Sequence, residues 1–290
     1  MDINNIQSGN AILEVRTYGN ASNEAVILLH GGPGVPDEMT EVREYLSESF
    51  RVITFNQRGT GKSSGRWCTY FVDEYLDDIN AIADNLNIDR FHLFGHSWGG
   101  LYAHLYARKY PARLLSLFMC SAAAGSGHIW KLVEKEVFSY NRKMSTKLQW
   151  LLMGIDSVLG FLGSDKAYRR LYRQVIINYN KGYNIEPPDD EKLAGINARA
   201  GNLTRRNIKN YEFYRTSGQV AYPVMITFGQ HDVYQKSRKY LTEQFPSASV
   251  VTIPNSGHTP WKHNWNAFRE VIRQFYRQIQ NKDLVTKAVI

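Results

Sequence analysis

The sequence has few cysteines and lacks any long hydrophobic run. Its two cysteines, Cys68 and Cys120, lie far apart, so neither a disulfide framework nor a cysteine metal site is indicated. No apolar run approaches the length that crosses a bilayer, and residues 1–10 are polar, without the basic and then apolar pattern of a secretory leader. These absences predict a cytoplasmic protein with no membrane partner.

Signatures of nucleic-acid binding are also missing. The net charge is +8 over 290 residues, but no zinc-finger, RNA-binding or helix-turn-helix pattern accompanies it. The excess is concentrated in residues 125–220, which hold 16 Lys and Arg against 9 Asp and Glu, while the rest of the chain is nearly neutral. We therefore expect no nucleic-acid partner. The basic segment is either a solvated outer face or a region that attracts an anionic substrate.

Apolar, strand-forming runs alternate with amphipathic helical patterns, which predicts an α/β fold. The expected strands are 12–16, 25–29, 51–55, the run from Phe91, 114–120, 224–228 and 249–253. The expected helices between them lie near 37–46, 70–86, 101–110, 237–244 and 265–280, and residues 281–290 are expected to fray.

The alternation stops between residues 125 and 221. Helical patterns replace it there, near 129–141, 147–162 and 165–179. Open α/β sheets hold ligands at the carboxyl ends of their strands, so we interpret 125–221 as a helical cap over that end. Residues 1–124 and 222–290 would then form the core.

The stretch Gly95-His96-Ser97-Trp98-Gly99 is the strongest functional signal. It follows an apolar run with strand character and precedes a helix-forming segment, which is the context of a nucleophile elbow. In such a turn a serine is held in a strained conformation at the tip of a strand, and the two glycines leave room where strand and helix crowd together. We predict that Ser97 projects its hydroxyl into a pocket and acts as a nucleophile.

A glycine-rich loop is the candidate for an oxyanion hole. The run His30-Gly31-Gly32-Pro33-Gly34 directly follows a buried strand, so its backbone can come close to a ligand. We expect the backbone N–H of Gly32, or that of Gly31, to be one donor and the N–H of Trp98 to be the other. A plain tight turn into the next helix is the alternative.

An acid and a base follow in the chain order Ser97, Asp232, His258. Asp232 comes just past a strand, and His258 follows the last strand in a loop that contains Gly257, so both can reach the end of the sheet where Ser97 lies. We expect His258 to take the proton of Ser97, and Asp232 to fix the imidazole tautomer and stabilise its cation. The other place for an acid, after Cys120, holds only small residues.

The loop of residues 56–64 contains Gly59-Thr60-Gly61-Lys62-Ser63, which is similar to part of a phosphate-binding loop but lacks the first glycine of that motif. We expect it to brace the mouth of the site, with Arg58 in a local hydrogen-bond network. No His-Glu-x-x-His pattern is present, so no metal site is expected. Six other histidines fall into two groups. We expect His92, His104, His128 and His263 to be structural, whereas His96 and His231 flank the predicted site.

Together these residues resemble the α/β-hydrolase superfamily, and within it the proline iminopeptidase-like serine hydrolases. The resemblance rests on the motifs 30–34, 57–63, 95–100, 229–232 and 256–258. It implies the α/β-hydrolase fold: a mostly parallel eight-stranded sheet flanked by helices, with a helical cap inserted after strand 6. It also implies a triad of Ser97, Asp232 and His258, and no cofactor.

The cap departs from the pattern of that family. Proline iminopeptidases hold the free amino group of the substrate with glutamates, one of them in a Trp-x-x-Trp-Glu motif that is absent here. Glu134, Glu136 and Glu212 are the candidates to replace them. Asn56 also stands where the family has an aspartate before Gln-Arg-Gly.

The expected function is that of a serine hydrolase that cleaves a small amide or ester through an acyl-enzyme, with N-terminal proline peptides or amino-acid amides as the first candidates. The alternative is a carboxylesterase, lactonase or thioesterase whose basic cap recognises an acidic acyl group. A third hypothesis is a non-catalytic receptor, against which the complete set of catalytic residues argues. Either enzyme would act on a small molecule or a short peptide, and the sequence leaves the oligomeric state open.

Overall fold

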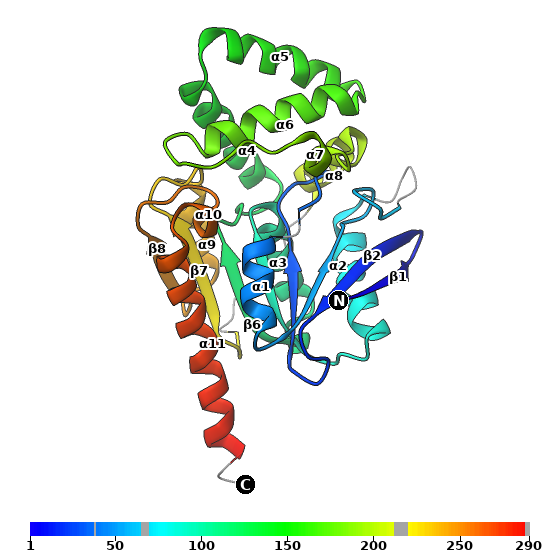
Figure 1. The fold of residues 1–290 in the computed structure, drawn as a ribbon, viewed down its shortest axis with the longest axis vertical. Helices are drawn as coiled ribbons and strands as arrows, with labels where there is room; N and C mark the ends of the chain where they lie inside the picture. Colours follow the sequence, from blue (N-terminus) through cyan, green and yellow to red (C-terminus); the bar gives the residue numbers. More distant parts are fainter. Residues whose placement is uncertain (38, 65–69, 212–219, 288–290) are drawn as a thin grey trace.

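The computed structural model of the chain describes all residues except 38, 65–69, 212–219 and 288–290, and describes side chains up to residue 280. Its strands form one sheet of eight in the order β1-β2-β4-β3-β5-β6-β7-β8 (Figure 1). The strands are β1 (Asp2–Ser8), β2 (Ala11–Tyr18), β3 (Ala25–Leu29), β4 (Arg51–Phe55), β5 (Phe91–His96), β6 (Leu114–Cys120), β7 (Val224–Gly229) and β8 (Ser249–Ile253). β1 and β2 pair antiparallel, as do β2 and β4, and the other pairings are parallel.

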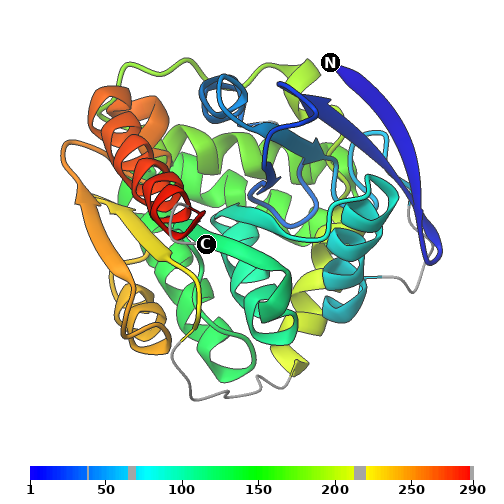
Figure 2. The ribbon, with the colours of Figure 1, turned by 90° about the horizontal axis from the view of Figure 1, so that it is seen from below.

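Both faces of the sheet are covered by helices, which is why its central strands β3, β5 and β6 are almost entirely buried and mostly apolar. In β3, Ile27 and Leu29 enter one hydrophobic core, and Val26 and Leu28 enter the other. Figure 2 shows α1 (Thr40–Ser47) and α11 (Trp265–Lys287) on one face, and α2 (Val72–Asn85), α3 (Trp98–Lys109) and α9 (Ser237–Gln244) on the other. The short helix α10 (Pro260–His263) precedes α11.

Helices fill the described chain between β6 and β7. They are α4 (His128–Met144), α5 (Lys147–Phe161), α6 (Asp165–Tyr179), α7 (Asp190–Leu193) and α8 (Ala198–Asn210). Thr146 and Gln149 form a capping box that starts α5, and the side chain of Ser164 caps α6. Figure 1 places α5 and α6 at one end of the molecule, beyond the sheet. Within the described residues, no helix combines the length and apolar character that spanning a membrane requires.

Several predicted elements coincide with observed ones, namely β3, β4, β6, β8, α6 and α9. The prediction that residues 281–290 fray is wrong in part, because α11 continues to Lys287 and residues 281–287 contain no Pro or Gly that would break the helix. The sequence patterns do not predict β1, α7, α8 or α10. β1 is mostly exposed and polar, and its pairing with β2 rather than a hydrophobic pattern defines it as a strand.

Candidate active site

Ser97 lies in a sharp turn between β5 and α3. Its backbone has φ 55° and ψ −118°, a conformation that side-chain-bearing residues rarely adopt. A Cβ atom on Gly99 would overlap the carbonyl oxygen of Leu29, and one on Gly95 would overlap that of Gly99. The predicted strained turn, with glycines where strand and helix meet, is therefore confirmed.

Ser97, Asp232 and His258 come together at the carboxyl ends of β5, β7 and β8. Nε2 of His258 lies 2.9 Å from Oγ of Ser97, and Nδ1 of His258 lies 2.9 Å from Oδ1 of Asp232. All three residues are buried, with 8% of Ser97, 2% of Asp232 and 4% of His258 exposed. The imidazole thus forms a hydrogen-bonded link between an alcohol and a carboxylate.

The carboxylate of Asp232 is held in its ionised form. Burial by itself raises the pKa of Asp232, but the charge and the hydrogen bond of His258 outweigh this effect and bring the pKa below its ordinary value. The backbone N–H of Tyr234 also donates to Oδ1, at 3.2 Å. An ionised Asp232 accepts a hydrogen bond from Nδ1–H of His258, which leaves Nε2 without a proton and able to accept one from Ser97.

Three rings surround the imidazole of His258. The rings of Tyr179, Tyr234 and His96 lie with their centroids 4.8, 5.0 and 5.0 Å from that of His258. Nε2 of His96 donates to the carbonyl oxygen of His258 at 2.9 Å. Burial lowers the pKa of His96 to about 3, so this second histidine stays neutral and does not repel a protonated His258.

The two predicted sources of oxyanion donors lie beside Ser97. Gly31 and Gly32 line the same cavity as Ser97, and a Cβ on Gly31 would lie 3.5 Å from Cβ of Ser97. The N–H of Trp98 belongs to the first turn of α3, where backbone N–H groups have no partner within the helix. A negative oxygen in this position would also be favoured by the positive end of the α3 dipole.

Gln57 connects these two segments, and sequence reasoning missed it. Its Nε2 donates to the carbonyl oxygen of His30 at 2.9 Å, and its Oε1 accepts the indole N–H of Trp98 at 2.8 Å. Its backbone N–H donates to Nε2 of His30 at 3.3 Å. One buried amide therefore fixes the glycine loop against the elbow. The loop that contains it, 57–63, was expected to brace the site, and this contact shows how.

The prediction that Arg58, in the same loop, belongs to a local hydrogen-bond network is confirmed. Its Nε lies 2.8 Å from Oδ2 of Asp78 and its Nη2 lies 2.6 Å from Oδ1. Both side chains are buried, Asp78 completely. Burial raises the pKa of Asp78, and the hydrogen bonds from Arg58 oppose this effect. The pair ties the loop to α2.

A cavity of about 470 Å³ opens onto Ser97 and His258. Most of its wall is aromatic and aliphatic and comes from α4, α5 and α6, including Trp130, Val133, Phe138, Trp150, Met153, Leu171, Tyr172 and Ile176. The charged side chains in the wall are those of Asp37, Glu134, Arg205 and Lys262. Such a wall suits a substrate with a large apolar part and a few polar groups.

The candidate amine-binding glutamates lie in different places. Glu134 lines the cavity, but its Oε2 lies 3.0 Å from Nζ of Lys209. Glu136 is turned away and accepts the backbone N–H groups of Lys236 and Ser237 at the start of α9. Glu212 lies outside the described residues.

Arg205, on α8, enters the cavity without a carboxylate partner among the described residues. Its guanidinium carbon lies 5.5 Å from the centre of the Tyr168 ring. Its positive charge lowers the pKa of Tyr172 and Tyr234, against the larger effect of burial. Sequence reasoning identified the segment as basic but did not single out this residue, because α8 itself was not predicted.

The other histidines agree with expectation only in part, since His96 lines the cavity and His231 does not. Nδ1 of His92 forms a hydrogen bond of 2.8 Å with Oγ of Ser116. The ring of His263 stacks on that of Tyr183, and its Nδ1 accepts the backbone N–H of Gly257 at 2.8 Å. His96 lines the cavity, and His231 is exposed. No group of three or more His, Cys, Asp and Glu in the described part of the chain could hold a metal ion.

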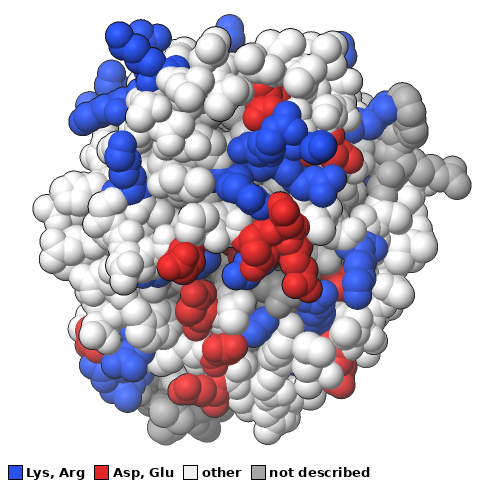
Figure 3. All heavy atoms as spheres, turned by 45° about the horizontal axis from the view of Figure 1, so that its top comes forward, with Lys and Arg blue, Asp and Glu red and all other residues white. Residues whose placement is uncertain are grey.

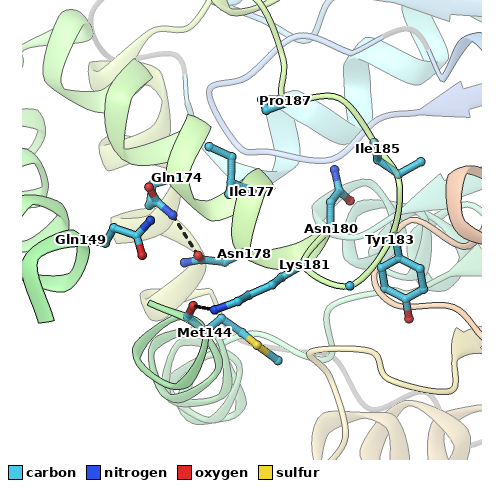
Figure 4. A pocket seen from close by; sticks show the side chains of 11 residues that line it. Met144, Gln149, Gln174, Ile177, Asn178, Asn180, Lys181, Tyr183, Ile185 and Pro187 are labelled. Carbon is cyan, nitrogen blue, oxygen red and sulfur yellow. Dashed lines mark hydrogen bonds between the residues drawn. The ribbon is translucent and has the colours of Figure 1, made fainter. Parts of the chain in front are cut away.

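A second, smaller cavity of about 230 Å³ lies where α4 ends and α6 ends (Figure 4). Several of its polar side chains are already paired: Nζ of Lys181 donates to the carbonyl oxygen of Met144 at 2.7 Å, and Nε2 of Gln174 donates to Oδ1 of Asn178 at 3.0 Å. Ser97 and His258 line the larger cavity, which is therefore the candidate active site.

The fold and the site together define a class. An eight-stranded, mostly parallel sheet with a serine elbow after β5 is the arrangement of α/β hydrolases. The model of the family described as alpha/beta hydrolase fold matches residues 24–261. The chain belongs to this family.

Within the family, the chain is similar to proline iminopeptidases. That of Clostridioides difficile is 24% identical over 264 residues, which cover 86% of this chain and 88% of the relative. The solved structure of the Mycobacterium smegmatis proline iminopeptidase has a TM-score of 0.68 at 18% identity and covers 97% of this chain and 100% of its own. An enol-lactonase from Burkholderia xenovorans has a TM-score of 0.67 at 19% identity, over 95% and 100% of the two chains. At these identities the structures share the fold.

Proposed function

We propose that the chain is a serine hydrolase that cleaves an ester or amide through an acyl-enzyme. One observation carries the proposal: Oγ of Ser97, the imidazole of His258 and the carboxylate of Asp232 form a continuous hydrogen-bonded line, with 2.9 Å at each step, at the floor of a substrate-sized cavity.

The reaction follows from this arrangement. Nε2 of His258 takes the proton of Ser97 as Oγ bonds to the carbonyl carbon of the substrate, and the carbonyl oxygen becomes negative. The N–H of Trp98 and that of Gly32, or of Gly31, donate to this oxygen. His258 then protonates the departing alcohol or amine. Water attacks the acyl group and loses a proton to His258. The bond between the acyl carbon and Oγ of Ser97 then breaks, His258 returns the proton to Oγ, and the acid is released.

The cavity favours an ester, or an amide without a free amino group, over an aminopeptidase substrate. A substrate ammonium would need a carboxylate beside it, but Glu134 is paired with Lys209 and Glu136 faces α9. Asp37, the other carboxylate of the wall, accepts the backbone N–H of Met39. Arg205, which pairs with no carboxylate in the part of the chain that the structure describes, instead offers its positive charge to an acidic substrate. The first candidate is therefore an esterase, lactonase or thioesterase that acts on an apolar acyl group carrying an acid.

The second candidate is an aminopeptidase of the proline iminopeptidase kind. The named relatives favour it, and so do Asp37 and Glu134, which line the cavity and carry the negative charge that an amine requires. We also retain, as a proposal, the division of the chain into a core of residues 1–124 and 222–290 and a cap of residues 125–221.

Two measurements test the proposal. A fluorophosphonate probe should label wild-type protein on the peptide that contains Ser97, and Ser97→Ala should lose both labelling and turnover while it keeps its fold. Ser157→Ala changes a serine elsewhere in the cavity wall and is the matched control. Labelling at another serine, or turnover in Ser97→Ala, would refute the mechanism.

A substrate panel separates the two candidates. It compares a neutral aryl ester, the hemi-ester of a dicarboxylic acid with the same aryl alcohol, and a proline arylamide. If Arg205 binds the acid, Arg205→Gln should lower kcat/KM for the hemi-ester by about 10-fold or more and leave the neutral ester nearly unchanged. Preference for the arylamide, with sensitivity to Glu134→Gln, would support the aminopeptidase instead.

A further inference from the structure

Helix α5 exposes a continuous apolar stripe to solvent. Its members recur at helical spacing and are between 41% and 76% exposed: Leu148, Leu151, Leu152, Ile155, Val158, Leu159, Phe161 and Leu162. We call this set the α5 face. Large side chains of this kind are scattered singly on most protein surfaces, whereas a contiguous group marks a contact with something apolar.

The opposite side of α5 faces the active-site cavity and helix α6. Trp150, Met153, Gly154 and Ser157 line the cavity that opens onto Ser97. Gly160 lies against Tyr168 of α6, where α5 packs on its neighbour. A surface helix of a globular protein is normally apolar on its inner side alone. Since the inner side of α5 already covers the cavity, the α5 face needs a separate explanation.

Positive charge borders the α5 face at both ends. Four cations are exposed there: Arg142 and Lys143 at the end of α4, Lys147 at the start of α5, and Lys166 at the start of α6. None of them forms an ion pair with a described carboxylate. Residues 142–173 contain seven Lys and Arg against two acids, and one of these, Asp156, is paired with Arg170. In Figure 3, most Asp and Glu side chains lie below the Lys and Arg side chains of this end.

The apolar α5 face and the cations at its ends together favour one kind of binding partner over another. A second copy of the chain related by a two-fold axis would bring like cations toward each other across the contact. An anionic lipid surface would attract the same cations while apolar side chains enter the boundary between headgroups and acyl chains. In Figure 1, α5 lies crosswise at the end of the molecule, so a flat surface can reach it without meeting the sheet.

We propose that the α5 face docks the protein on an anionic lipid surface, with Arg142, Lys143, Lys147 and Lys166 contacting headgroups. This inference departs from the expectation of no membrane partner. Docking would place the helix that lines the cavity directly on the lipid, so that an amphiphilic substrate could enter without crossing water. Binding itself does not depend on the proposed hydrolase activity.

The test is co-sedimentation of the full chain with vesicles of phosphatidylcholine alone or mixed with phosphatidylglycerol. Wild-type protein should bind the mixed vesicles, bind pure phosphatidylcholine at least about 10-fold more weakly, and dissociate as salt is raised. Leu151→Ser, Ile155→Ser and Val158→Ser together should lower binding to mixed vesicles by about 10-fold or more. Ile3→Ser with Ile12→Ser, which changes exposed apolar side chains of β1 and β2, should leave it unchanged.

A charge variant makes the test independent of the apolar one. Lys143→Gln with Lys147→Gln should weaken binding about 5-fold for each lysine, whereas Lys236→Gln with Lys239→Gln, at α9, should not. No binding to mixed vesicles, or equal binding by the three-serine variant, would overturn the proposal. A solution dimer that dissociates in the three-serine variant and does not bind vesicles would assign the α5 face to a second copy.

Discussion

The indole N–H of Trp98 donates to Oε1 of Gln57 at 2.8 Å, across 41 positions of the chain. The other end of the same amide holds the carbonyl oxygen of His30 at 2.9 Å. Both proposed oxyanion donors therefore depend on one buried side chain for their relative position. Gln57 is thus a positioning residue, since it contacts the loops and not the reacting atoms.

Gln57→Leu should lower kcat by about 10-fold or more with little change in KM, because a donor that is misplaced fails to stabilise the transition state more than the ground state. The variant also leaves the carbonyl of His30 without its donor, which should cost about 1–3 kcal/mol of stability. Steady-state kinetics and urea unfolding measure the two effects. Gln174→Leu removes a side-chain hydrogen bond at the smaller cavity and should leave kcat intact; an equal loss there would argue against positioning.

Asp232→Asn should retain the fold and lower kcat by about 10⁴-fold, because an amide in this place no longer fixes the Nδ1–H tautomer of His258 or stabilises its cation. Asp77→Asn changes an exposed acid on α2 and is the matched control. The measurement is kcat of wild type and of both variants with any substrate that the panel identifies. A kcat within about tenfold of wild type would remove Asp232 from the catalytic group.

Arg58→Met should destabilise the protein by about 3–5 kcal/mol, since it leaves the fully buried carboxylate of Asp78 without its charge partner. Urea unfolding measures this difference. Adding Asp78→Leu should recover much of the loss, because a buried ion pair replaced by apolar groups is often tolerated. If the double variant is as unstable as the single one, the loop packing rather than the unpaired charge causes the loss.

The stability of the protein should fall in mild acid. Burial lowers the pKa of His104 to about 3, whereas an unfolded histidine titrates near 6.5. The free energy of unfolding is therefore unaffected by this titration above pH about 6.5. It falls as the pH drops toward 3, by about 2 kcal/mol at pH 5, because the unfolded state binds a proton that the buried ring does not. Urea unfolding at pH 8 and pH 5 should show a smaller difference in His104→Leu than in wild type, by about that amount. Equal differences in both proteins would show that His104 titrates normally.

Local sequence signals account for most of the fold and for the ends of the strands. The glycines around Ser97 mark a turn in which a Cβ atom would overlap neighbouring backbone, and Asp232 and His258 follow the predicted strands β7 and β8. In a parallel sheet such strand ends share one edge, so chain order alone brings the three residues near each other.

Long-range contacts explain what the sequence did not predict. The role of Gln57 depends on two loops that meet only in the folded chain. Arg205 enters the cavity from α8, a polar helix whose buried side is formed mostly by small residues rather than by large apolar ones, namely Ala198, Ala200, Gly201, Thr204 and Ile208. The α5 face was included in a predicted helix, but α5 is apolar on both sides, so its pattern cannot indicate which side is exposed.

The antiparallel strand β1 forms one border of the sheet, and its outer backbone groups face no neighbouring strand within the described chain. An unpaired border of this kind can recruit a strand from another molecule and start aggregation. Asp2, Asn4, Asn5 and Gln7 make that border polar. The polar residues that give β1 no recognisable strand pattern therefore also protect the folded protein against edge-to-edge association.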